Sequence, residues 1–476
     1  MFDGPNADGG TAARAPAPGV PRLVREHLPA RAGIDVSEST QHDEGCRHAS
    51  EQLRAVTDRL DWAWQDPPAT GFVPPIRRDA RVKEPDVSAL PHQPDLVVLS
   101  HLRWEWVWQR PQHLVSRWAK LRAAAGARTW FVEEPEAGDV TTPELRHDEI
   151  DGIHRVWLVV PTPPGQPKAL GFDADDTEEY GTMVADLLAE AGSPRQPDVL
   201  LYTPMALDIA LELSPGRLMY DVMDDLGSFL KAPQGLQLRQ RRLLAEADVV
   251  FTGGRSLHAG VSQHRTTRCH LFPSGVETSH YATSRSLREQ HDRKVAGYVG
   301  VIDERIDLEL VAALAAALPE WTIRIVGPVA KIEESDLPQA ANLEYHGMTA
   351  YGELPRVMAG FDVALMPFAL NEATRSISPT KTLEYLAAGL PVVSTRVADV
   401  VTDYSGVVHF ADDAAEFAAA CQEVVEHSRA ERDRRLRPIQ ERQEWDYIAS
   451  SMAALMVEDA TGPAVIDLTV RGEVTA

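Results

Sequence analysis

The sequence predicts an α/β protein with two doubly wound parallel sheets that face each other across a cleft, preceded by a flexible N-terminal extension. From residue 95 onward, short runs rich in β-branched residues alternate with amphipathic segments, which is the pattern of parallel strands covered by helices. The alternation forms two series, separated by a polar stretch near 275–295. With 476 residues, the chain is also too long for one hydrophobic core. Ligands of such sheets bind outside the carboxyl ends of the strands, so a site is expected in the cleft.

Residues 1–90 are expected to be a separate extension. The first 20 residues are rich in Gly, Ala and Pro, a composition typical of disorder. A helix is expected near 47–64, and the proline-rich stretch at 66–85 is typical of a linker.

The first predicted domain spans residues 91–285. Its strands are expected in DLVVLS (95–100), RTWFVEEP (128–135), HRVWLVVP (154–161), PDVLLYTP (197–204), GRLMYDVMDD (216–225), DVVFTGG (248–254) and CHLFPSG (269–275). A helix is expected over RQRRLLAEA (239–247).

The second predicted domain spans 286–430 and repeats the alternation. Its strands are expected in VAGYVGV (295–301), TIRIVGP (322–328), NLEYHG (342–347), DVALMPF (362–368) and PVVST (391–395), with helices at 308–318, near 351–360 and from Pro379. Residues 431–476 are expected to form a helix that returns toward the first domain, followed by a tail.

Composition excludes several classes of function. The formal net charge of −24 argues against a nucleic-acid binder and against a polybasic membrane patch. No apolar run approaches the roughly 20 residues of a spanning helix, and the N-terminus lacks the apolar core of a signal peptide. Cys46, Cys269 and Cys421 are far apart, which fits a reduced, cytoplasmic setting and no zinc site.

The most informative segment is NEATRSISPTKTLEYLAAGLPVVST, residues 371–395. Ser378 is expected to cap a helix and Pro379 to occupy its first position. Thr380 and Lys381 would then present backbone N–H groups at the positive end of the helix dipole, which is an anion site. Glu384, three residues later, would share the face of Lys381. The alternative is a capped surface helix with a Lys–Glu pair, but its position at the cleft favours a diphosphate.

A second candidate is GYVGVIDERIDLEL, residues 297–310. Arg305 lies in the loop after a predicted strand, with Asp307 as the expected cap of the next helix, and an arginine there can neutralise phosphate oxygens. Pairing of Arg305 with Asp303 or Glu304 is the alternative. The segment has no GxGxxG fingerprint, so a dinucleotide-dependent dehydrogenase is not expected.

A third candidate is SHLRWEWVWQRPQHLVSRW, residues 100–118. Its polar residues His101, Arg103, Arg110 and His113 are expected around a loop that faces the cleft. His101, at the strand end, is the preferred functional residue, whereas Arg110 and His113 are also explained as capping and packing groups.

The acidic segment YDVMDD could hold Mg²⁺ through Asp221, Asp224 and Asp225. Acidic clusters are more often solvated faces, so capping or cleft-wall roles are preferred here. The expectation is a site without metal or other cofactor.

The order of these motifs resembles the bacterial group 1 (family 4-like) glycosyltransferases of the GT-B fold, over about residues 92–456. The segments that carry the resemblance are FPSGVE, GYVGVIDERID, IRIVGP, YHG, DVALMPF and SPTKTLEYLAAGLPVVST. HLRWEWVWQRPQHL and YDVMDDLGSF resemble the branch found beside, or fused to, UDP-galactopyranose mutases and among teichuronic-acid-type transferases.

The resemblance implies that the second Rossmann-like domain binds a nucleoside diphosphate sugar and the first binds the acceptor. Arg305 and Lys381 would bind the phosphates, and Glu384 the ribose. The implied donor-binding residues are Gly300, Gly327, Met348, Ser376, Ser378, Thr380, Glu384 and Glu372. The implied acceptor-side residues are Arg103, Arg110 and His113. The family's earlier glutamate is Ser376 here, with Glu372 as the expected substitute, and the family's arginine after the strand glycine is Val301.

The expected activity is transfer of a sugar from a UDP- or GDP-linked donor to a glycan, lipid-linked or small-molecule acceptor in cell-envelope or polysaccharide biosynthesis. Retention of configuration is expected, with His101 as the base if the enzyme inverts. Such a protein would work in the cytoplasm, including peripheral association with the inner face of the membrane. The alternatives are a nucleotide-sugar epimerase of the same architecture and a non-catalytic binding scaffold.

Overall fold

The structure, a computed structural model, describes residues 93–161, 170–174, 177–193, 196–228, 232–265, 267–288 and 291–457. These residues all belong to one compact unit of the chain. The expected extension of residues 1–90, with its helix near 47–64, lies outside them.

The first sheet has nine strands, eight of them in the order β3-β5-β2-β1-β6-β7-β8-β9, with β4 also paired to β5. Its strands are β1 (Leu96–Ser100), β2 (Thr129–Glu133), β3 (Glu136–Gly138), β4 (Glu144–Ile150), β5 (Ile153–Pro161), β6 (Asp198–Leu201), β7 (Arg217–Val222), β8 (Val249–Thr252) and β9 (Cys269–Leu271). All pairings are parallel except that of β4 with β5. The sheet therefore contains each strand expected from the sequence and adds β3 and β4.

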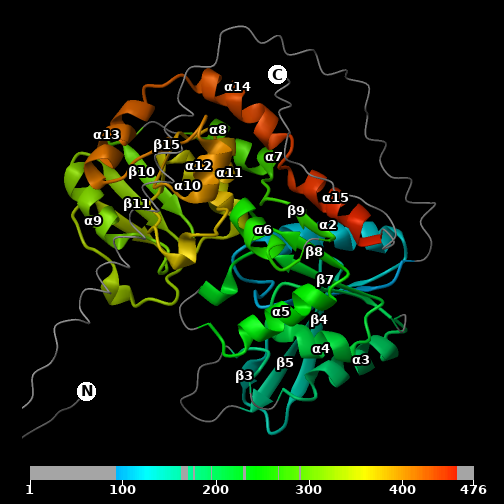
Figure 1. Cartoon of the computed structure of the whole chain (residues 1–476). Coiled ribbons are helices and arrows are strands. Elements are labelled where there is room, and N and C mark those ends of the chain that lie inside the picture. The colour runs from blue at the N-terminus through cyan, green and yellow to red at the C-terminus, as the bar shows by residue number, and fades with distance from the viewer. Residues whose placement is uncertain are drawn as a thin grey trace, which may run out of the picture. The chain divides into compact units, whose positions relative to one another are not determined.

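Helices cover both faces of the first sheet (Figure 1). They are α2 (Arg110–Ala124), α3 (Tyr180–Glu190), α4 (Leu207–Glu212), α5 (Leu236–Glu246) and α6 (Arg255–Ser262), with short 3₁₀ turns η3 (Pro204–Ala206) and η4 (Leu226–Ser228). Alternate residues of β1 point to opposite faces: Leu96 and Val98 pack with α2, and Val97 and Leu99 with α3 and α4. Both faces of β1 are therefore buried, which is why its sequence is apolar throughout.

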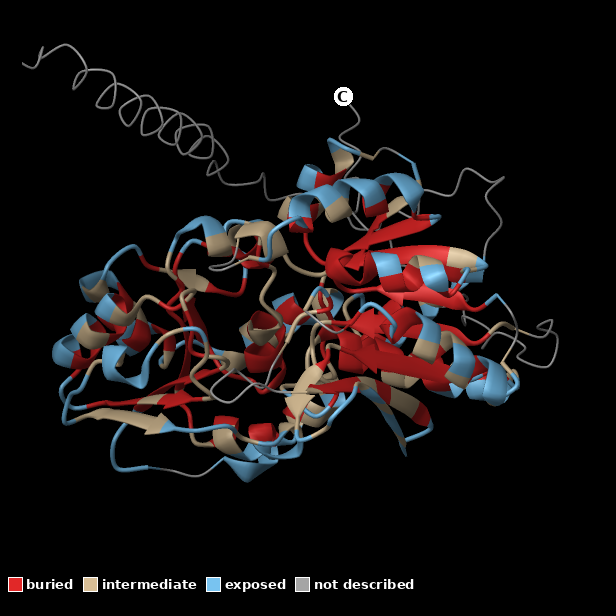
Figure 2. Ribbon diagram, turned by 90° about the horizontal axis from the view of Figure 1, so that it is seen from below, coloured by how far each residue is buried: buried red, intermediate tan, exposed pale blue. Residues whose placement is uncertain are grey.

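The second sheet has six parallel strands in the order β12-β11-β10-β13-β14-β15. They are β10 (Val295–Val299), β11 (Thr322–Val326), β12 (Leu343–His346), β13 (Val363–Met366), β14 (Val392–Ser394) and β15 (His409–Phe410). The helices and turns of this half are α7 (Thr278–Ala282), α8 (Ser284–Leu287), α9 (Leu308–Ala317), η5 (Glu334–Asp336), η6 (Tyr351–Glu353), α10 (Leu354–Ala359), η7 (Glu372–Thr374), α11 (Thr380–Ala387), α12 (Ala398–Tyr404), α13 (Ala414–Val424) and α14 (Arg429–Gln440). Figure 2 shows the buried strands lying between helices whose outer sides are exposed. The predicted class of two doubly wound parallel sheets is thus confirmed.

The last described helix, α15 (Trp445–Val457), packs against α2 of the first domain. The indole N–H of Trp118 donates a hydrogen bond to the carbonyl oxygen of Ala449 over 2.9 Å. The C-terminal segment is therefore part of the first domain's core.

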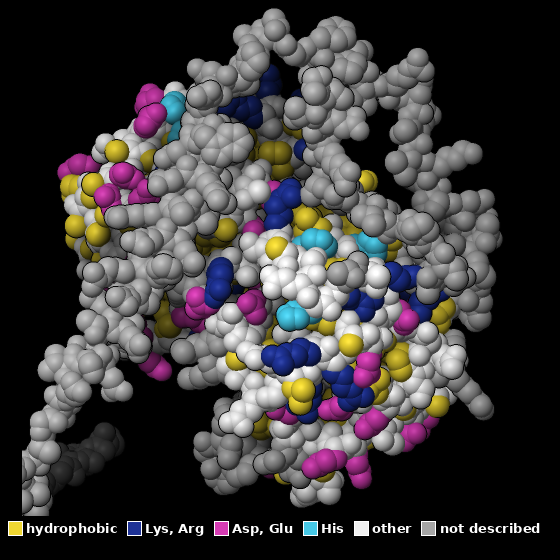
Figure 3. All heavy atoms as spheres, viewed as in Figure 1, with side chains coloured by type: hydrophobic (Ala, Val, Ile, Leu, Met, Phe, Trp, Pro, Cys, Tyr) yellow, Lys and Arg dark blue, Asp and Glu magenta, His cyan; other side chains and the backbone are white. Residues whose placement is uncertain are grey.

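Within the described ranges, the structure has no helix that is both long and apolar enough to span a membrane. On the face shown in Figure 3, described basic side chains lie among acidic ones.

Candidate active site at the carboxyl ends of the two sheets

A pocket of about 110 Å³ lies where the carboxyl ends of the two sheets meet. The first domain contributes the segment before α2, the residues after β7 and Ser274 after β9, and the second contributes the residues after β10 and the start of α11. Among the residues lining the pocket are five of the predicted site residues from the second domain, namely Gly300, Arg305, Ser378, Thr380 and Lys381. They are up to 81 positions apart in the sequence (381 − 300), and the fold brings them to one cavity, which we call the reaction pocket.

Helix α11 points its first turn at this pocket. It begins at Thr380, and Pro379 rather than Ser378 occupies the N-cap position, with no side-chain cap. The expected serine cap is therefore wrong, because proline takes the extended backbone conformation of the cap residue itself, with φ −68° and ψ 119°. The first N–H groups of a helix have no partner within it. Without a side chain to cap them, they remain available to an anion.

Lys381 and Glu384 form an ion pair on the pocket side of α11. The Nζ–Oε2 distance is 2.7 Å, and the two side chains are 15% and 5% exposed. The pair has the predicted spacing, but it is largely buried and is not the solvated surface pair of the alternative interpretation.

Arg305 forms a forked contact with Asp303 two residues earlier. Its Nε lies 2.9 Å from Oδ1, and its Nη2 lies 2.7 Å from Oδ2. The Arg305 side chain stays 25% exposed, while that of Asp303 is 3% exposed. Asp307 caps α9 as predicted, because its Oδ1 accepts the N–H of Leu310 over 2.8 Å. The loop thus fixes a guanidinium at the pocket wall.

Asp224 contributes a carboxyl group from the opposite wall of the pocket, after β7. Burial raises its pKa to about 6, although Arg305 and Lys331 act in the opposite direction. The sequence interpretation placed Asp224 in the cleft wall, and the structure shows it there. Within the described residues, no group of three or more His, Cys, Asp or Glu side chains could hold a metal ion.

The two glycines at the ends of β10 and β11 allow these strand ends to approach closely. Gly327 has a φ of +148°, and a Cβ atom there would lie 1.9 Å from the carbonyl oxygen of Gly300. A side chain at residue 327 is therefore excluded sterically. Gly300 lines the reaction pocket, whereas Gly327 and Met348 do not, and Met348 is 49% exposed.

Glu372 and Ser376, two further predicted donor-binding residues, also lie outside the reaction pocket. Glu372 is in η7, where its side chain is 72% exposed and pairs with Arg375. Ser376 lines a different cavity on the first domain. The predicted replacement of the family's earlier glutamate by Glu372 has no support from its position in the structure.

His101 and Arg103 follow β1 but do not line the reaction pocket. Burial, followed by the charge of Lys331, lowers the pKa of His101 to about 4. Arg103 donates to Glu133 over 3.0 Å and to the carbonyl oxygens of Glu134 and Pro135. Arg103 therefore holds the loop after β1 to the end of β2.

Arg110 does line the pocket, yet its donors point into the first domain. Its Nε lies 2.8 Å from the buried carboxylate of Asp221, and its Nη1 donates to the carbonyl oxygen of Phe272 over 2.8 Å. His113 is buried and stacks on Trp445 with ring centroids 4.9 Å apart. Burial holds its pKa well below the usual range. These contacts agree with the capping and packing alternative for both residues.

Two sets of contacts between the domains were not predicted. Trp108 of the first domain lines the pocket and stacks on Tyr351 of the second, which in turn stacks on His280 at 4.3 Å. Near the start of α6, the carboxylate of Asp399 from α12 accepts hydrogen bonds from the backbone N–H and hydroxyl group of Ser256 over 3.1 and 2.5 Å. Such contacts join residues far apart in sequence, so no local pattern signals them.

Comparison with known proteins supports this architecture. Residues 293–427 match the family described as glycosyl transferases group 1. A protein of Bacillus subtilis (strain 168) named "Putative teichuronic acid biosynthesis glycosyltransferase TuaH" is 27% identical over 222 residues, which cover 44% of this chain and 56% of the relative. The chain thus matches little more than half the length of that relative.

Solved structures share the arrangement of both domains. An α,α-trehalose-phosphate synthase (UDP-forming) from Burkholderia xenovorans, in complex with glucose-6-phosphate, superposes with a TM-score of 0.56 at 13% identity over 76% of this chain and 99% of its own. The catalytic domain of starch synthase IV from Arabidopsis thaliana, bound to ADP and acarbose, superposes with a TM-score of 0.52 at 9% identity over 76% of this chain and 99% of its own. The chain therefore has the GT-B fold, and the part that forms its second domain is similar to the group 1 glycosyltransferases.

Proposed function

We propose that the protein is a glycosyltransferase that uses a nucleoside diphosphate sugar. The observation that carries the proposal is the reaction pocket, where Arg305, Lys381 and the uncapped start of α11 converge between the two domains. Two cations and free N–H groups at a helix start are the features that bind a diphosphate. The family match of residues 293–427 covers all three features.

The reaction transfers the sugar to a hydroxyl group of the acceptor. The hydroxyl oxygen forms a bond to the anomeric carbon, the bond from that carbon to the diphosphate oxygen breaks, and the hydroxyl proton leaves with the diphosphate. Negative charge grows on the departing group, so groups already aimed at it stabilise the transition state more than the ground state. Arg305 and Lys381 supply that stabilisation.

The donor is a UDP- or GDP-linked sugar, and the acceptor is a glycan, lipid-linked or small-molecule hydroxyl compound of the cell envelope. The name of the B. subtilis relative supports the envelope assignment, and the UDP-forming synthase supports a nucleotide-sugar donor. A lipid-linked acceptor would place the reaction at the inner, cytoplasmic face of the membrane.

We also propose that configuration is retained and that neither a metal ion nor another cofactor takes part. A base is required for inversion, and His101, with a pKa of about 4, is a weak proton acceptor at neutral pH. If the enzyme inverts, Asp224 is better placed, because it lines the reaction pocket and its pKa is about 6.

Thermal-shift measurements with UDP, GDP and their sugars test the donor assignment, because a ligand that binds only the folded state raises Tm. We expect a rise with one nucleotide series, and NMR of the product anomer then decides between retention and inversion. Conversion of the donor without an acceptor into its epimer would indicate an epimerase. Binding without turnover on any acceptor would indicate a scaffold, and no shift with any nucleotide would refute the proposal.

A further inference from the structure

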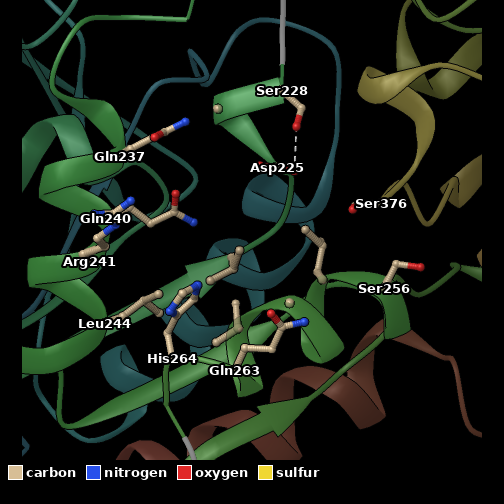
Figure 4. Close-up of a pocket in the computed structure, with 15 residues that line it drawn as sticks. Asp225, Ser228, Gln237, Gln240, Arg241, Leu244, Ser256, Gln263, His264 and Ser376 are labelled. Carbon is tan, nitrogen blue, oxygen red and sulfur yellow. Dashed lines mark hydrogen bonds between the residues drawn. The ribbon is translucent and has the colours of Figure 1, made fainter. Parts of the chain in front are cut away.

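The first domain carries a second cavity, larger than the reaction pocket, with a volume of about 340 Å³ (Figure 4). It lies between α5 and α6, and Ser376 lines it from the second domain. We call it the α5–α6 groove.

Five polar side chains of this groove have no hydrogen-bond or ion-pair partner among the described residues. Among the described residues, no hydrogen bond or ion pair involves the side chain of Gln237, Gln240, Arg241, Gln263 or His264. The first three come from α5, and the other two follow the last turn of α6. Figure 4 shows these side chains around one hollow, with Leu244 also at its wall. Polar groups gathered in this way without internal partners are available to a ligand.

The groove adjoins the reaction pocket. Val222 and Asp225 line the groove, while Met223 and Asp224 between them line the reaction pocket. In the second domain, Ser376 faces the groove and the residues from 377 onward line the pocket. Neighbouring Cα atoms are about 3.8 Å apart, so only one thickness of chain separates the two cavities. A ligand in the groove would therefore lie next to a donor held in the reaction pocket.

The chemistry of the groove fits a saccharide. Carboxamide groups both donate and accept hydrogen bonds, as sugar hydroxyl groups do, and three of them line the groove together with Ser228 and Asp225. Leu257 and Val261 also line the groove but are only 5% exposed, so its polar side chains would carry most of the recognition. Arg241 can bind a carboxylate or phosphate on the sugar.

We propose that the α5–α6 groove binds the acceptor saccharide, with a preference for a sugar that carries an anionic substituent. This inference rests on the proposed function, because the reaction pocket must hold the donor. Arg103, Arg110 and His113, implied by the resemblance, already contact groups of the first domain. The five side chains of the groove make no hydrogen bond or ion pair among the described residues.

Gly260 allows the groove to be filled without disturbing the fold. It lines the groove, and a Cβ atom built on it meets nothing within 4 Å. We expect Gly260→Phe to fold normally and to obstruct the groove. Gly406→Phe is the matched control, because residue 406 also has open space around it and lines neither cavity. Arg241→Gln tests the anionic preference.

Binding is measured by saturation-transfer NMR with glucose, N-acetylglucosamine, glucuronate and glucose 6-phosphate, each with UDP or GDP present. We expect wild type and Gly406→Phe to bind at least one anionic probe, Gly260→Phe to lose it, and Arg241→Gln to bind it about tenfold more weakly, as for loss of one charged hydrogen bond. Lack of binding by the wild type, or unchanged binding by Gly260→Phe, would overturn the proposal. The nucleotide shift in Tm should be the same in all four proteins, so failure of the donor assignment appears separately.

Discussion

The two walls of the reaction pocket use the same kinds of ion pair for different purposes. In the first domain, Arg110 pairs with Asp221, which is 111 positions away, and both side chains are at most 2% exposed. In the second domain, Arg305 pairs with Asp303 two positions away, and its side chain is 25% exposed.

The sequence distance between the partners of an ion pair affects whether its cation remains available to a ligand. A pair between distant elements joins them and, once buried, costs much to break because a lone charge is then left in an apolar interior. A pair within one loop or one helical turn only orients the cation, as with Lys381 and Glu384. In the proposed function the locally paired cations bind the diphosphate, whereas the Arg110–Asp221 pair joins α2 to β7.

Breaking the distant pair should give the largest effect. Arg110→Leu leaves the Asp221 carboxylate buried without its cation, and we expect a loss of about 3–5 kcal/mol in the free energy of unfolding. Urea denaturation measures it. The double variant Arg110→Leu/Asp221→Leu should recover most of the loss, because no buried charge remains. A single variant that lost less than about 1 kcal/mol would show that the pair behaves as a surface pair.

Removing the cation of the helical pair should affect turnover more than stability. We expect Lys381→Ala/Glu384→Gln to lower kcat about 10- to 150-fold, because a charged hydrogen bond of about 1.5–3 kcal/mol to the leaving group is lost. Glu384→Gln alone, which keeps the lysine, serves as the control in the same assay and in urea denaturation. Near-normal turnover in the double variant would refute the role of Lys381.

A subtler change tests the loop pair. Arg305→Lys keeps the charge but loses the forked geometry, and we expect kcat/KM for the donor to fall about two- to tenfold with little change in Tm. Arg324→Lys is a matched control, because Arg324 pairs with Glu344 at 2.9 Å, is 28% exposed and lines neither cavity. Equal effects of the two changes would contradict a specific role for Arg305.

Replacing Asp224 should give the smallest effect, a change in Tm that depends on pH. Its pKa is raised from 3.8 to about 6, so between these values the folded state binds more protons than the unfolded state and stability falls as the pH rises. Asp224→Asn removes this loss. We expect its Tm to exceed that of the wild type above pH 6 and the difference to shrink toward about pH 4. A Tm difference that is constant over that range would contradict the raised pKa.

The same distinction between local and distant contacts explains how much the sequence could predict. The order of strands and helices follows from hydrophobic runs, and the positions of Lys381, Glu384 and Arg305 follow from spacings of a few residues, so both were accessible. The antiparallel strand β4 was missed because its residues are mostly charged and four of its seven positions are exposed, as at many sheet edges. The burial of Arg110 against Asp221, the stacking of Trp108 on Tyr351 and the α5–α6 groove depend on residues that the fold brings together from distant segments.

The contact between Asp399 and Ser256 has a consequence for dividing the chain. Helix α6 belongs to the first domain, but the carboxylate that binds its first turn comes from the second. A fragment ending before β10 would lose that partner, and the opening turn of α6 would fray or recruit a buffer anion such as phosphate. Separate expression of the halves would thus alter the wall of the α5–α6 groove at Ser256, so ligand studies call for the intact polypeptide.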